Sequence, residues 1–180
     1  MSLLQLHLLG SPVLRQRSAE VTVFDEELRK FVADMFETME AANGVGLAAN
    51  QVGVARRVAV VEAEGKRFAM VNPRLVQVEG RGTQEEGCLS IPDVFGDVTR
   101  PTKVVLEAQD EHGQPYRLEA EGLVARAIQH EIDHLDGILF LDHMGALRRA
   151  MLLKKFRKEH AGESYLKHVR DAEPETARGL

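Results

Sequence analysis

The sequence contains a single cysteine, Cys88, among its 180 residues. An intramolecular disulfide is therefore excluded, and a reducing compartment is expected. Long apolar runs are also missing, since no stretch approaches the roughly 18 consecutive apolar residues of a membrane-spanning helix. The leucine-rich start, residues 1–10, lacks a preceding basic segment and is interrupted by His7, so we expect mature sequence rather than a signal peptide. These features predict a cytoplasmic protein with no membrane and no disulfide partner.

The chain has little excess charge of either sign. It contains 23 Lys and Arg against 28 Asp and Glu, a formal net charge of −5, so its bulk charge does not favour nucleic-acid binding. Hydrophobic residues make up 44% and charged residues 28%, as in ordinary globular proteins. Repeats, linkers and low-complexity segments are absent. We expect one domain over residues 1–160 and a polar, flexible tail over residues 161–180.

Apolar residues recur at three- and four-residue spacing between residues 25 and 42, which predicts a helix. Thr22 or Asp25 can cap its start, and Asn43 with Gly44 can end it, because both residue types tolerate positive φ.

Two further helices are predicted, over residues 123–135 and 144–159. The sequence Asp136-Gly137 is a stop signal for the first of them. Leu147, Met151 and Leu152 are expected on the inner side of the second.

Between the helices the sequence predicts short strands separated by turn residues. Two of them flank Asp110-Glu111-His112-Gly113 and form a predicted hairpin. Helices that bracket a run of strands predict an α+β fold, with mostly antiparallel sheets around a central helix and helices near both ends. The expected strands cover residues 58–61, 68–71, 75–78, 104–108 and 116–120.

The segment His130-Glu131-Ile132-Asp133-His134 falls on the predicted central helix. Residues four apart lie one turn apart on the same face, so both imidazoles can reach one metal ion. Glu131 is rotated by about 100° from them and can approach a water molecule without ligating the metal. This pattern is typical of metallohydrolases, with two histidine ligands and a glutamate general base. The alternative is an ordinary helix whose histidines make hydrogen bonds.

Two other segments contain candidate functional groups. A catalytic metal of this type needs a third protein ligand, and Cys88 is a candidate, although a lone cysteine is more often a small buried apolar residue. Residues 44–51 contain two glycines and two alanines, which permit close backbone approach. The segment ends at Gln51, whose amide can donate to an oxyanion, but alone it is equally compatible with a plain loop.

Together and in this order, the three segments closely resemble peptide deformylases. The family pattern is a glycine-alanine loop ending in glutamine, then Glu-Gly-Cys-Leu-Ser, then a His-Glu-x-x-His helix. All three are complete here, as GVGLAANQ from Gly44, EGCLS from Glu86 and QHEIDH from Gln129. The resemblance extends from about residue 11 to residue 158. It implies a catalytic domain that removes the formyl group from the N-terminal formyl-methionine of newly synthesised polypeptides and releases formate.

The resemblance also implies one divalent metal ion. In this family the ion is commonly Fe²⁺, and Zn²⁺, Ni²⁺ or Co²⁺ can occupy the same site. The donor chemistry of one thiolate and two imidazoles does not choose among these ions. The implied ligands are Cys88, His130 and His134.

A mechanism follows from these assignments. Metal-activated hydroxide attacks the formyl carbon, while Glu131 accepts the proton of the water and passes it to the departing amine. The resemblance implies two donors to the oxyanion, the side-chain amide of Gln51 and the backbone N–H of Leu89.

Substrate recognition requires a narrow space around the formyl group and an apolar pocket for the methionine side chain. Leu123 is a candidate wall of that pocket, but it can equally be core. Arg126 can border the pocket or lie on the surface. The substrate-binding residues that we expect are Gly44, Val45, Gly46, Glu86, Gly87, Leu123 and Ala127.

The predicted third helix is basic, which suggests transient contact with ribosomal RNA through phosphate attraction. The alternative is a solvated face whose cations suit a helix C-terminus. The basic residues are Arg148, Arg149, Lys154, Lys155, Arg157 and Lys158.

Two other functions share parts of the pattern. A metalloprotease that cuts internal peptide bonds would have the same helix motif, but the cysteine ligand and the glycine-rich loop fit it poorly. A non-catalytic metal-binding module or ribosome-associated factor would need neither Glu131 nor Gln51. A structural zinc site would also usually have a fourth protein ligand. His143 and His112 are poor candidates, because one lies beyond Gly137 and the other in the hairpin loop.

Overall fold

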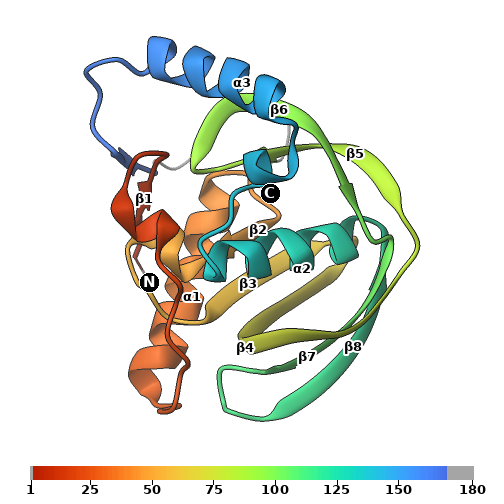
Figure 1. The fold of residues 1–180 in the computed structure, drawn as a ribbon. Helices are drawn as coiled ribbons and strands as arrows, with labels where there is room; N and C mark the ends of the chain where they lie inside the picture. Colours follow the sequence, from red (N-terminus) through yellow and green to blue (C-terminus); the bar gives the residue numbers. More distant parts are fainter. Residues whose placement is uncertain (1, 170–180) are drawn as a thin grey trace.

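Three α-helices and nine strands form within residues 2–169, the part of the chain that this computed structural model describes (Figure 1). The helices are α1 (Glu26–Ala41), α2 (Gly122–Leu135) and α3 (Ala146–Glu159). The strands are β1 (Gln5–His7), β2 (Gly46–Ala48), β3 (Val58–Ala63), β4 (Lys66–Glu79), β5 (Gly82–Cys88), β6 (Ile91–Arg100), β7 (Lys103–Gln109), β8 (Pro115–Glu121) and β9 (Leu166–His168). Short 3₁₀ helices occur at η1 (Pro12–Arg15), η2 (Ala49–Val52) and η3 (Phe140–His143).

The strands form three antiparallel sheets. The largest has the order β2-β3-β4-β7-β8, while β5 pairs with β6 and β1 pairs with β9. Within the large sheet the predicted hairpin is present, with Ala108 opposite Tyr116 across β7 and β8. The predicted α+β class, with mostly antiparallel sheets around a central helix, is therefore confirmed.

Strand β3 explains how two helices are placed on opposite faces of the large sheet. Its alternate residues point to opposite sides. Val58 and Val60 pack in the cluster that contains the apolar residues of α1, whereas Ala59 and Val61 pack in the cluster that contains those of α2. The predicted strand is thus buried on both faces, and the sheet separates α1 from α2 (Figure 1).

The ends of the helices follow the predicted signals. Asp25 rather than Thr22 caps α1, because its side chain accepts a hydrogen bond from the backbone N–H of Leu28 at 3.0 Å. Asn43 follows α1 with a φ of 57°. Gly137 follows α2 with a φ of 75°, a conformation that suits glycine.

The expected inner side of α3 is wrong for two of its three residues. Leu147 and Met151 are 78% and 60% exposed. Leu152 is half-buried, and the helix is anchored by Phe156, which packs with the core cluster under β6 and η3. The first half of α3 thus exposes two of its apolar side chains, Leu147 and Met151, while Leu152 and Phe156 pack against the core.

Part of the segment expected as a flexible tail forms a strand. Residues 166–168 pair with β1, with Leu6 opposite Lys167. These three residues are exposed, so the apolar pattern gave no signal for a pairing made by backbone hydrogen bonds. Residues 170–180 of the predicted tail lie outside the described part. No helix in residues 2–169 is both long and apolar enough to cross a bilayer.

Candidate active site

Helix α2 and the end of strand β5 bring together three side chains that could hold a metal ion. His130 and His134 lie one turn apart on α2, with their Nε2 atoms 3.1 Å from each other. The Sγ atom of Cys88, the last residue of β5, lies 3.3 Å from Nε2 of His134. All three ligand atoms lie within 4.8 Å of one another, and all three residues are buried. The convergence expected from the sequence is therefore present.

The spacing of these atoms fits a single small cation. In a tetrahedral site with metal–nitrogen distances near 2.0–2.1 Å and a metal–sulfur distance near 2.3 Å, ligand atoms are separated by roughly 3.3–3.6 Å. The two separations of 3.1 and 3.3 Å are close to these values. Burial raises the pKa of the Cys88 thiol and lowers that of His134, so a bound cation is the partner that would favour the thiolate.

Glu86 holds the first imidazole in place. Its Oε1 lies 3.0 Å from Nδ1 of His130, which leaves Nε2 free to face the other ligand atoms. The carboxylate also accepts hydrogen bonds from Arg100 at 2.7 and 2.9 Å and from Arg126 at 2.6 Å. Burial opposes its charge, but the hydrogen bonds from His130 and Arg100 outweigh burial and hold the pKa of Glu86 far below its usual value. The Glu86 side chain is thus occupied in supporting a ligand.

Glu131 lies next to the ligands without being bonded to them. It is fully buried, and neither carboxylate oxygen has a hydrogen-bond partner among the described residues. Burial raises the pKa of Glu131 well above its usual value. A Cβ atom at Gly46 would lie 2.6 Å from its Oε1, so any residue other than glycine there would force the carboxylate to shift. An unpartnered buried carboxylate of this kind needs a ligand or substrate group beside it.

The side-chain amide of Gln51 faces the sulfur side of the cluster. Its Oε1 accepts from the backbone N–H of Ala48 at 2.9 Å, which fixes the orientation of the amide. Its Nε2 donates to Ser90 Oγ at 3.1 Å and lies 3.6 Å from Sγ of Cys88. Leu89 follows Cys88 directly in the turn between β5 and β6. A Cβ at Gly44 would lie 2.7 Å from Cδ1 of Leu89, so the glycine-rich loop packs closely against this turn.

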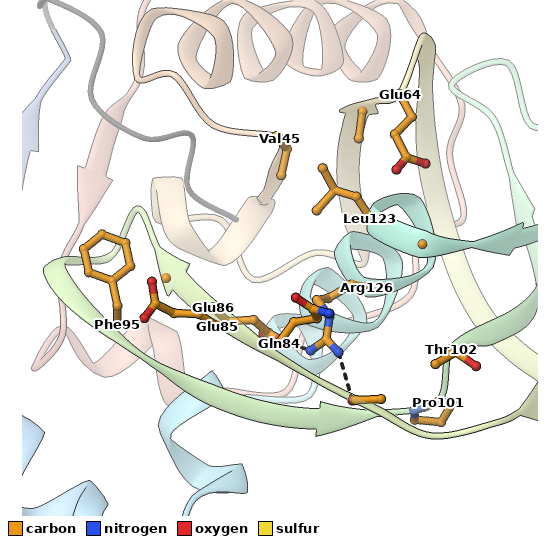
Figure 2. Close-up of a pocket in the computed structure, with 14 residues that line it drawn as sticks. Val45, Glu64, Gln84, Glu85, Glu86, Phe95, Pro101, Thr102, Leu123 and Arg126 are labelled. Carbon is orange, nitrogen blue, oxygen red and sulfur yellow. Dashed lines mark hydrogen bonds and ion pairs between the residues drawn. The ribbon is translucent and has the colours of Figure 1, made fainter.

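A cavity of about 510 Å³ is lined by Glu86, which bonds His130, and by Gly87, which precedes Cys88 (Figure 2). Among the predicted substrate-binding residues, Val45, Glu86, Gly87 and Leu123 line it. Leu123 is 39% exposed, so it belongs to the cavity wall rather than to the core.

The other expected wall residue, Ala127, is placed differently. It is fully buried in the core cluster between α2 and the large sheet. Arg126, whose place the sequence left open, borders the cavity (Figure 2) and donates to the carbonyls of Val98 and Gly82.

Sequence reasoning missed Arg100 and did not predict that Arg126 also holds Glu86. Arg100 ends β6 and Arg126 lies inside α2, and neither belongs to a short motif. A buried glutamate requires cationic partners, but the sequence does not indicate which arginines supply them. The two remaining candidate histidines are placed as expected. His143 bonds Asp133 at 2.7 Å, and the side chain of His112 is exposed, so no fourth protein ligand is found in residues 2–169.

This arrangement matches one known family. The family model described as polypeptide deformylase matches residues 3–150. The chain belongs to the polypeptide deformylase family.

Deformylases from several bacteria are similar to this chain over most of its length. The peptide deformylase of Brucella suis is 51% identical over 164 residues, which cover 88% of this chain and 94% of that protein. The peptide deformylase of Caldicellulosiruptor bescii is 51% identical over 142 residues, covering 79% and 86%.

Solved deformylase structures share the fold. The Legionella pneumophila enzyme superimposes with a TM-score of 0.83 at 40% identity, covering 91% of this chain and all of that one. The Ehrlichia chaffeensis enzyme in complex with actinonin gives a TM-score of 0.85 at 36% identity, covering 89% and 99%.

Membership of the family establishes the reaction class. The chain is a metal-dependent deformylase, a hydrolase of protein biosynthesis that removes the formyl group from the N-terminal methionine of nascent polypeptides. This result rejects the two alternative predictions, a metalloprotease that cuts internal peptide bonds and a non-catalytic metal-binding module.

Proposed function

We propose that Cys88, His130 and His134 hold one divalent cation and that Glu131 is the general base of deformylation. The observation that supports this proposal is the convergence of one sulfur and two ring nitrogens beside a buried carboxylate without a partner. A bound cation supplies a Lewis acid that polarises the formyl carbonyl and makes water more acidic.

Side-chain and backbone groups of the protein carry out the remaining steps. Glu131 takes a proton from the attacking water and delivers it to the nitrogen of the departing methionine. Gly46 leaves the space that this carboxylate occupies. The amide of Gln51 and the backbone N–H of Leu89 donate to the oxyanion that develops on the formyl oxygen. Donors fixed in advance are effective because they need no reorganisation, and the bond from Ala48 fixes the amide of Gln51.

The cavity lined by Val45, Leu123 and Arg126 receives the methionine side chain in this proposal. Val45 and Leu123 are apolar, and the methylene stem of Arg126 adds apolar surface while its charged end is bonded to Glu86. The glycines at positions 44 and 46 keep the acyl side narrow, which favours a formyl group over larger acyl groups.

The ion in the cell is proposed to be Fe²⁺, with Zn²⁺, Ni²⁺ and Co²⁺ able to replace it. A mixed thiolate and imidazole site binds all four of these ions. Anaerobic purification followed by metal analysis and a formate-release assay on the same sample tests the ion and the reaction together. Formate release from formyl-Met-Ala-Ser with casein left intact is the expected result; cleavage of casein or a metal-free active sample would contradict the proposal.

We also propose that the enzyme acts in the cytoplasm and makes transient ribosome contact through α3. The helix lies at the edge of the molecule (Figure 1), and its basic residues come with two exposed apolar ones, Leu147 and Met151. Replacing Arg148, Arg149 and Lys154 by glutamate should abolish salt-sensitive co-sedimentation with ribosomes while formate release from a tripeptide is unchanged. Undiminished co-sedimentation would reject this contact.

A further inference from the structure

The two histidines of the cluster are held in different ways. The ring of His130 is oriented by Glu86 through its Nδ1 atom. The Nδ1 atom of His134 is buried and has no hydrogen-bond partner among residues 2–169. A histidine that binds a metal is usually held through its second ring nitrogen. Because His134 lacks that support, the position of its ring depends on the position of its backbone.

The backbone of His134 lies where a helix is least well held. Helix α2 ends at Leu135, one residue later, and last turns fray unless their carbonyl groups are bonded. Within residues 2–169, the carbonyl of His134 accepts from the backbone N–H groups of Asp136 and Gly137 and from one side chain, since Asn50 donates its Nδ2 to this oxygen at 2.5 Å. Asn50 belongs to η2, 84 positions earlier in the chain, and is fully buried.

Asn50 also precedes Gln51 directly. Gln51 contacts Ser90 and the sulfur of Cys88, so two adjacent side chains reach both elements that supply metal ligands. Asn50 contacts the end of α2, and Gln51 contacts the turn after β5. Residues 50 and 51 thus contact both sides of the 3.3 Å separation between Sγ of Cys88 and Nε2 of His134.

We propose that Asn50 is a positioning residue for the metal centre, which fixes the last turn of α2 and through it the imidazole of His134. This inference rests on the proposed metal site. Asn50 touches neither substrate nor metal. Its contribution is to keep His134 at the distance from Cys88 and His130 that one cation requires, and to join that histidine to the segment that presents Gln51.

The chain offers a matched control for the same helix end. Arg57 donates to the carbonyl of Leu135 at 3.2 Å and to Asp136 at 2.9 Å. Replacing Arg57 removes a comparable hydrogen bond from the end of α2. That bond holds Leu135, which is not one of the proposed metal ligands. A merely structural role for Asn50 predicts the same behaviour for variants at positions 50 and 57.

The test compares Asn50→Ala, Asn50→Ser and Arg57→Met in protein loaded with Co²⁺ and confirmed as folded by circular dichroism. Transfer of Co²⁺ to a chelating dye gives the rate of metal release, and the visible absorption bands of Co²⁺ report the ligand geometry. We expect release about 10-fold faster in both Asn50 variants, with altered bands. Arg57→Met should lower the melting temperature while its release rate and bands stay those of the wild type.

Excess Co²⁺ should restore part of the kcat of the Asn50 variants, because their reactive groups remain. Wild-type release rates and bands in both Asn50 variants would overturn the inference, as would equal acceleration in Arg57→Met. If neither Asn50 variant folds, a crystal structure of the metal-loaded wild type decides: an Asn50 amide more than about 3.5 Å from the His134 carbonyl overturns it. Wild-type protein that binds no Co²⁺ would instead contradict the proposed metal site itself.

Discussion

At the scale of single residues, the candidate site combines a buried carboxylate without a hydrogen-bond partner among the described residues and a glycine that leaves room for it. Glu131 is buried and has no hydrogen-bond partner in residues 2–169, and Gly46 leaves the space beside it. Glu131 and Gly46 give two predictions in which a substitution lowers turnover but leaves the bound metal in place. A third concerns the amide of Gln51.

Glu131→Ala should lose nearly all turnover and keep its metal. The carboxylate is the proposed proton acceptor but is not one of the three ligands. Formate release and metal content measured on one preparation check this. A variant that retains more than about a tenth of wild-type activity would show that Glu131 is not the general base.

Gly46→Ala should reduce kcat strongly while metal content stays near that of the wild type. The new methyl group would lie 2.6 Å from Oε1 of Glu131, so the carboxylate must move away from its place. Gly145→Ala is a matched control, because a Cβ there meets no atom within 4 Å and the φ of Gly145, −59°, suits alanine. Equal activity in Gly46→Ala and the wild type would refute the close fit between these two residues.

Gln51→Ala should lower kcat by roughly 10²–10³, the cost of removing one oxyanion donor, with KM for a formylated tripeptide little changed. The variant is expected to be slow but not inactive, because the N–H of Leu89 remains. Steady-state kinetics on metal-saturated protein measure both constants. A rise in KM at constant kcat would indicate a role in substrate binding instead.

At the scale of elements, 3₁₀ turns and short strands hold the helices in place. The turn η3 connects α2 to α3, and Asp142 within it accepts from the backbone N–H of Leu139 at 3.0 Å. The same carboxylate pairs with Arg15 of η1 at 2.6 Å. Burial opposes ionisation, but the bonds from Arg15 and Leu139 outweigh it, so the pKa of Asp142 is lowered.

Asp142→Asn should therefore reduce the free energy of unfolding at pH 7 by about 1 kcal/mol, since the ion pair is partly exposed. A lowered pKa in the folded state means that this stabilisation is present above the pKa of an unfolded aspartate, about 4, and is lost as pH falls through the folded value. Urea unfolding of both proteins at a series of pH values checks this. A difference that persists unchanged at low pH would contradict the assignment.

The elements also show what the sequence could and could not predict. Helix α2 was predictable because its stop signal and its histidine spacing are local. Strands β5 and β6 were not predicted, because glycine, proline and acidic residues interrupt their alternation. The metal ligands and Gln51 lie in short motifs, whereas Arg100 and Asn50 act through contacts made far along the chain. Such contacts have no signature in the local sequence. The prediction for α3 was wrong because long-range packing also decides which face of that helix is buried.

At the scale of the whole molecule, the proposed metal centre joins α2 to the β5–β6 hairpin. Removing the cation should lower the melting temperature, because an ion that binds only the folded state stabilises it by about 2.7 kcal/mol at a concentration 100-fold above Kd. For a chain of this size that corresponds to roughly 5–10 °C. Calorimetry before and after chelation, and after Zn²⁺ is added back, measures the shift. No shift in either direction would mean that the ligands are held together without the ion.

The pairing of β1 with β9 places residue 5 opposite residue 168. A circularly permuted form of residues 5–168 thus becomes feasible, in which a short glycine-rich linker joins residue 168 to residue 5. The new chain ends could be placed in the turn between β7 and β8. Strand β8 forms the edge of the large sheet opposite to β2. Such a molecule would let both termini carry probes that are remote from the helix proposed to meet the ribosome.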